Sequence, residues 1–146
     1  MVTKQLYKIL EAPCDTGRNI AIIKVKMIEL ERMMLPGAIR YDKDAVQSSP
    51  QDPMLAFAEK MDELNRQLEG LESKYINEYQ IVEKLIEPLD TKHKGVLTLK
   101  YLAGFKPEEI ANKLSYAESY VYKLQREAIQ ILEESKKDSK SQQMIV

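Results

Sequence analysis

The chain has 146 residues, of which 44% are hydrophobic and 31% are charged, and its formal net charge is −1. This balance is typical of a globular protein of one domain or two small helical ones. A single cysteine and a single histidine exclude an internal disulfide and a zinc site, and no apolar run approaches the roughly 20 residues of a membrane span. We therefore expect a cytoplasmic protein with no metal, no cofactor and no membrane partner.

The N-terminal third predicts one amphipathic helix. Residues 1–14 show a weak apolar pattern that ends at Pro13 and predicts at most one or two helical turns. Asp15 or Thr16 can cap the helix that follows, because a side-chain oxygen there accepts from the free amides of the first turn. Up to about residue 35, apolar residues recur every three or four positions and form one stripe: Ile20, Ile23, Met27, Leu30 and Met34.

A connector is predicted at 36–52. Pro36 and Gly37 end the first helix, and the residues after them show no apolar periodicity. Such a stretch indicates either a solvated connector or an ordered functional loop.

A long helix is predicted at 53–87. Asp52 and Pro53 are a strong helix start, and the helix would contain about 35 residues and span roughly 50 Å. Its apolar residues keep a seven-residue repeat typical of a coiled-coil seam: Phe57, Met61, Leu64, Leu68, Leu71, Tyr75, Val82 and Leu85. This stripe must pack on the first helix, on the C-terminal region or on another copy of the chain. We expect a homo-oligomer through 53–87, and residues 1–87 would form a helical framework and oligomerisation region.

Short helices follow in the predicted C-terminal domain, 88–135. Pro88 stops or kinks the long helix, Asp90 caps the next helix, and Gly104 closes it near residue 103. We expect His93, which lies between two lysines, to be exposed to solvent. Pro107 begins a further helix, and residues 136–146 are expected to form a flexible tail.

A helix-turn-helix pattern lies within 107–132. The inward positions of this pattern hold Ile110, Ala111, Leu114, Val121, Leu124, Ala128 and Leu132. Ala111 matches the small residue that is needed where two helices cross closely. Ser115 stands where glycine is usual, and Ala117 replaces the usual Ser/Thr cap, so about 1 kcal/mol of helix stabilisation is missing.

Helical geometry then predicts a DNA-contacting face on the second helix. Its members are Ser119, Tyr120, Tyr122, Lys123, Gln125 and Arg126. Gln125 and Arg126 are suited to adenine and guanine edges, Lys123 to a phosphate, and the tyrosines to a thymine methyl or a phosphate. The alternative is an ordinary solvated helix face with the tyrosines partly in the core. Six Lys or Arg balance six Glu between Lys106 and Lys137, so we expect modest affinity per copy.

The run LTLKYLAGFKPEEIANKLSYAESYVYKLQREAIQIL resembles region four of bacterial sigma factors. Over most of its length, including VQSS at 46–49, the chain resembles ArpU/RinA-like late transcription activators of phages and prophages of Gram-positive hosts. The resemblance implies binding to double-stranded DNA at a promoter and contact with host RNA polymerase.

The sequence therefore predicts an all-α, sequence-specific DNA-binding transcriptional regulator, phage or prophage encoded, in the cytoplasm of a bacterial host. Helix 118–134 would enter the major groove. Two alternatives stay open, a small terminase-like DNA-packaging subunit and a helical protein-interaction module that does not bind DNA. An enzyme is not expected, because the chain offers no nucleophile–base pair, glycine-rich phosphate loop or metal cluster.

Overall fold

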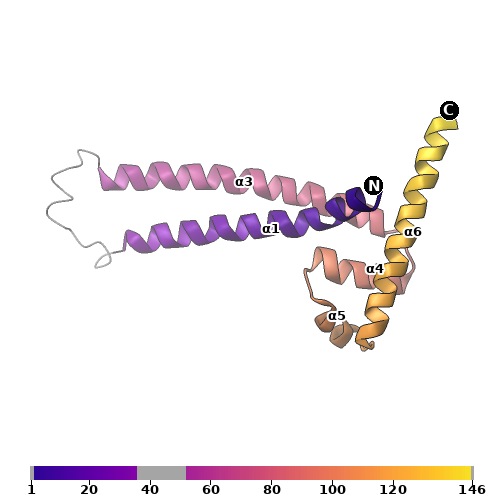
Figure 1. Ribbon diagram of the computed structural model, residues 1–146. Coiled ribbons are helices and arrows are strands. Elements are labelled where there is room, and N and C mark those ends of the chain that lie inside the picture. Colours follow the sequence, from indigo (N-terminus) through magenta and orange to yellow (C-terminus); the bar gives the residue numbers. More distant parts are fainter. Residues whose placement is uncertain (1, 36–51, 146) are drawn as a thin grey trace. The chain divides into compact units, whose positions relative to one another are not determined.

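The protein is all-α, as the sequence predicts. The computed structural model describes residues 2–35 and 52–145, and it describes side chains up to residue 136. The helices within these ranges are α1 (Val2–Met33), α3 (Pro53–Ile86), α4 (Thr91–Leu97), the π-helix η1 (Thr98–Leu102), α5 (Pro107–Leu114) and α6 (Glu118–Ile145) (Figure 1). The connector predicted at 36–52, with its VQSS motif, lies outside the described residues except for Asp52.

The chain divides into two compact units. One unit holds Met1–Asp15 together with Tyr75–Val146, and the other holds Thr16–Lys74. This division differs from the expected boundary near residue 87, because both the first 15 residues and the end of α3 belong with the C-terminal helices. Within the described ranges, no helix combines the length and the apolar character needed to cross a membrane.

The first helix begins at Val2, not near residue 16, and it continues through Pro13. A proline inside a helix costs about 3 kcal/mol, since it removes one hydrogen bond and crowds the preceding turn. Leu6 and Leu10 are fully buried, and burial of each leucine contributes about 1.5–3 kcal/mol, which offsets that cost. Thr16, expected as a cap, is instead a buried residue of the helix interior.

A partly buried hydrogen bond also connects the N-terminal part of α1 to η1. The Cys14 thiol donates a hydrogen bond to the carbonyl oxygen of Tyr101 at 3.2 Å. Burial, followed by repulsion from Tyr7, Glu11 and Cys14, raises the pKa of Tyr101 to about 12. The start of α1 therefore packs into this unit through Leu6, Leu10 and Cys14, and it forms more than the one or two helical turns expected from the sequence.

In the unit Thr16–Lys74, parts of α1 and α3 run side by side in opposite directions (Figure 1). The α1 stripe predicted from the sequence is buried or half-buried at all five positions, and Ile23 is its most buried member. Within this unit the α3 stripe is likewise buried or half-buried, and Leu64 is its most buried residue here. The apolar repeat of α3 is therefore shielded within a single chain, which is one of the partners that the sequence left open.

Two apolar clusters form the core of the other unit. The first joins α1, α3, α4, η1 and α6 through Leu6, Leu10, Val82, Ile86, Leu89, Leu97, Tyr101, Ala128, Ile129 and Leu132. The second, here called the turn cluster, lies under α5 and the start of α6 and consists of Val96, Ile110, Ala111, Val121 and Leu124. The turn cluster positions the candidate site.

The last helix is longer than predicted. The sequence places a tail at 136–146, whereas α6 is helical as far as Ile145. No glycine or proline occurs after residue 118, so no residue type in this stretch stops the helix.

Candidate nucleic-acid interface

Helix α5 forms the first half of the candidate interface. Pro107 occupies the first turn, and the Glu109 carboxylate accepts from the Lys106 amide at 3.2 Å, so the helix start is capped from within. Ile110 and Ala111 are buried in the turn cluster. The small side chain predicted at Ala111 therefore lies in the core beneath the two helices.

The turn between α5 and α6 contains one strained residue. Ser115 has φ 57° and ψ 42°, the left-handed conformation that favours glycine. The Tyr116 amide then donates to the Ala111 carbonyl at 2.9 Å, and the Tyr116 ring meets Tyr120 edge-to-face with centroids 5.0 Å apart. The chain thus reverses at the position where the sequence pattern expects glycine, and Tyr116 packs against the turn cluster at this corner.

The start of α6 is held by backbone hydrogen bonds. The Ala117 carbonyl accepts from the amides of Tyr120 at 3.0 Å and Val121 at 3.2 Å. The side chain of Ala117 is a methyl group, which cannot accept a hydrogen bond. The amides of the first turn therefore lack the side-chain cap that serine or threonine would provide. Glu118, in the first turn, interacts favourably with the positive end of the helix dipole.

Helix α6 has one buried face and one exposed face near its start. The buried residues are Val121, Leu124, Gln125, Ala128, Ile129 and Leu132. Four of the six predicted contact residues, Ser119, Tyr122, Lys123 and Arg126, are exposed. They follow one another at steps of three, one and three, which places them on a single side of the helix. We call this set the exposed face.

Gln125 is not on the exposed face, and the prediction that it faces outward is wrong. Its side chain is only 8% exposed, and its Oε1 accepts from the Lys100 ammonium of η1 at 3.5 Å. Its position explains the error, since it lies four residues after Val121 and four before Ile129. Both neighbours are buried, because helices pack on two sides of α6 and widen its buried stripe. Ile129 is the signal in the sequence that could have revealed this.

Tyr120 has a mixed environment. The ring is half-buried and packs against the turn cluster, whereas the hydroxyl accepts from the Lys92 ammonium of α4 at 3.5 Å. The ring therefore belongs partly to the core, as one of the alternatives for the tyrosines predicts, whereas the hydroxyl lies at the surface.

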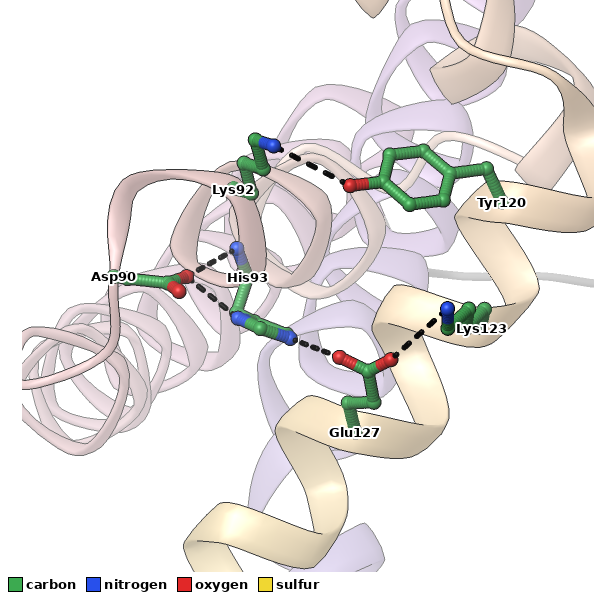
Figure 2. A network of polar contacts seen from close by, with 6 residues as sticks. All are labelled: Asp90, Lys92, His93, Tyr120, Lys123 and Glu127. Carbon is green, nitrogen blue, oxygen red and sulfur yellow. Dashed lines mark hydrogen bonds and ion pairs between the residues drawn. The ribbon is translucent and has the colours of Figure 1, made fainter.

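His93 is buried, and the expectation that it is exposed is wrong. The side chain connects α4 to α6: its Nδ1 lies 2.5 Å from the Asp90 carboxylate, and its Nε2 lies 3.0 Å from the Glu127 carboxylate (Figure 2). Asp90 also accepts from the His93 amide at 3.0 Å, which is the helix cap that the sequence predicts. The Lys123 ammonium approaches the other oxygen of Glu127 at 4.0 Å. The local sequence around His93 could not reveal its partner Glu127, because that residue lies 34 positions further along the chain.

The two carboxylates determine the charge of this network. Burial alone disfavours the charged imidazole, but the hydrogen bonds and charges of Glu127 and Asp90 outweigh it and raise the pKa of His93 above 6.5. Hydrogen bonds from the backbone and then the side chain of His93 lower the pKa of Asp90 below 3.8. Protonated His93 is thus paired with both acids.

The described side chains contain no group of three or more His, Cys, Asp or Glu residues placed to hold a metal ion. Comparison with known proteins adds no assignment, since the chain matches no protein-family model, no curated protein and no solved structure.

Proposed function

We propose that the chain is a sequence-specific DNA-binding transcriptional regulator that inserts the start of α6 into the major groove. A phage or prophage origin and action on host RNA polymerase are parts of the same proposal, and they rest on the resemblance described above. Self-association through α3 is also proposed, and it would use large apolar side chains that α3 leaves exposed, such as Ile76 and Ile81. The proposal assigns no catalytic step to the chain.

One observation carries the proposal. Ser119, Tyr122, Lys123 and Arg126 share the exposed face in the first turns of a helix whose opposite face is buried over the turn cluster. Helices that read DNA contact base edges mainly from their N-terminal part, while the preceding helix supports them from behind. A short, tight turn at Ser115–Ala117 and a small buried residue at Ala111 are features that such an arrangement requires.

The chemistry of the exposed face suits a duplex. The Arg126 guanidinium can donate two hydrogen bonds to O6 and N7 of one guanine, and each such pair contributes about 1–3 kcal/mol of discrimination. Lys123 and Ser119 can donate to phosphate oxygens, and the Tyr122 ring can contact a thymine methyl. Gln125 is withdrawn from the set of contacts because it is buried.

Selection of bound sequences from a random duplex pool, at two salt concentrations, tests the proposal. We expect an enriched motif and an affinity that falls steeply with salt. On the selected site, Arg126→Ala should weaken binding by roughly 5- to 150-fold and relax one position of the motif. Arg66→Ala is the matched control, because Arg66 is an exposed arginine on α3 in the other unit. Equal losses for the two variants, or no enriched sequence, would reject the assignment.

A second candidate is a helical protein-interaction module. On α1, Ile22, Val25 and Ile28 are each more than half exposed, which is unusual for large apolar side chains so close together. A module of this kind would bind its partner with little dependence on salt, whereas DNA binding weakens steeply as salt rises. The same salt series therefore separates the two candidates.

A further inference from the structure

Beside the exposed face, Lys92 and Tyr120 form a small polar site. The Lys92 ammonium of α4 and the Tyr120 hydroxyl of α6 lie 3.5 Å apart, and their side chains point toward one another (Figure 2). Lys92 is exposed, while the Tyr120 ring is held by its edge-to-face contact with Tyr116. The hydroxyl is therefore fixed at the surface next to a cation.

The nearby acids are engaged by other groups. The Lys92 ammonium donates to the neutral hydroxyl of Tyr120 and also attracts the Asp90 carboxylate, which, like Glu127, accepts a hydrogen bond from His93. Lys123 also lies 4.0 Å from Glu127, and Lys94 pairs with Glu87 at 3.4 Å. Protonated His93 and Lys123 together offset the charges of the two carboxylates, so that Lys92 leaves this surface with an excess of positive charge.

We propose that Lys92 and Tyr120 together bind one phosphate of the DNA backbone while the exposed face of α6 reads the bases. This inference rests on the proposed function and adds a site to it. An ammonium supplies up to three donors and a phenol supplies one, so a phosphate oxygen placed near both can accept from each. Backbone contacts of this kind set the orientation of a reading helix on the duplex and carry no sequence information themselves.

The position of Tyr120 supports this division of labour. It lies in the first turn of α6, one residue after Ser119 of the exposed face, but on the flank of the helix that meets α4. A phosphate held there would lie beside the groove that α6 enters. His93 acts as a positioning residue, because it joins α4 to α6 through Asp90 and Glu127 and so keeps Lys92 close to Tyr120.

The test is the salt dependence of binding to a short fluorescein-labelled duplex of arbitrary sequence, measured by fluorescence anisotropy between about 50 and 200 mM salt. Removal of one phosphate contact should reduce the slope of log K against log salt by about 0.9 for Lys92→Gln. Lys92→Arg, which keeps the charge, should restore the slope. Lys94→Gln, in which a neighbouring lysine paired with Glu87 is neutralised, should leave it unchanged. Tyr120→Phe keeps the ring and should lower the affinity with little change in slope.

The outcomes separate this inference from the proposed function. Wild-type protein that shows no salt-dependent binding to any duplex would overturn both. Wild-type binding with equal slopes for Lys92→Gln and Lys94→Gln would overturn the phosphate site alone. A reduced slope for Lys92→Gln, with no change in the base preference of the selected motif, would support it.

Discussion

The left-handed turn residue Ser115 makes a quantitative prediction about stability. A residue with a Cβ atom pays about 1–2 kcal/mol for this conformation, and Ser115 has φ 57°. Glycine removes that strain, but it gains freedom in the unfolded chain that is equivalent to about 0.5–1 kcal/mol. The difference between the central values predicts that Ser115→Gly raises the free energy of unfolding by roughly 0.75 kcal/mol. For a domain of this size, that corresponds to an increase in Tm of roughly 2–6 °C.

The matched control is the same substitution four residues later. Ser119 is exposed and helical, so Ser119→Gly should lower the free energy of unfolding by about 0.5 kcal/mol. Urea unfolding followed by circular dichroism measures both variants, and Ser115→Ala separates the role of the hydroxyl from that of the backbone conformation. If Ser115→Gly destabilises the protein as much as Ser119→Gly does, the strain argument fails.

Three further predictions concern the same unit. Ala117→Ser supplies the missing cap of α6 and should raise the free energy of unfolding by about 1 kcal/mol in the same urea assay, whereas an unchanged midpoint would argue against an uncapped start. Ala111→Glu places an unpaired charge in the turn cluster and should lower the free energy of unfolding by more than about 3 kcal/mol. The expected sign is loss of the cooperative melting transition, and a normal transition would show that position 111 is not in the core. The pKa of His93 is raised on folding, so its contribution to stability is fully present below pH 6.5 and is lost as pH rises through the folded-state pKa. Unfolding free energies measured from about pH 6 to 9 should therefore decline for wild type and decline less for His93→Gln, and parallel curves would refute this linkage.

Local chemistry was sufficient to predict much of this protein. The steps of three and four in Ile20–Met34 and in Phe57–Leu71 predicted the helices and their buried stripes, because helical periodicity depends only on neighbouring residues. Asp90 was predicted as a cap for the same reason, and its hydrogen bond to the His93 amide confirms it. The all-α class follows from these local signals.

The errors arose where a distant segment decides the environment of a residue. Pro13 lies within a continuous helix because Leu6 and Leu10 are buried against α3, α4, η1 and α6. The sequence near Pro13 does not reveal this long-range packing. Gln125 carries a polar side chain that favours solvent, yet η1 covers it.

His93 shows the same limit at the candidate site. Lysines flank it in the sequence and indicate a solvated position, whereas Asp90 and Glu127 enclose it in the folded chain. The sequence by itself determined which residues form helices, which sides of those helices are apolar, and that Ser119, Tyr122, Lys123 and Arg126 share a face. Tertiary structure alone decided which polar side chains are buried, because burial depends on the elements that pack from elsewhere in the chain and not on the pattern along one helix.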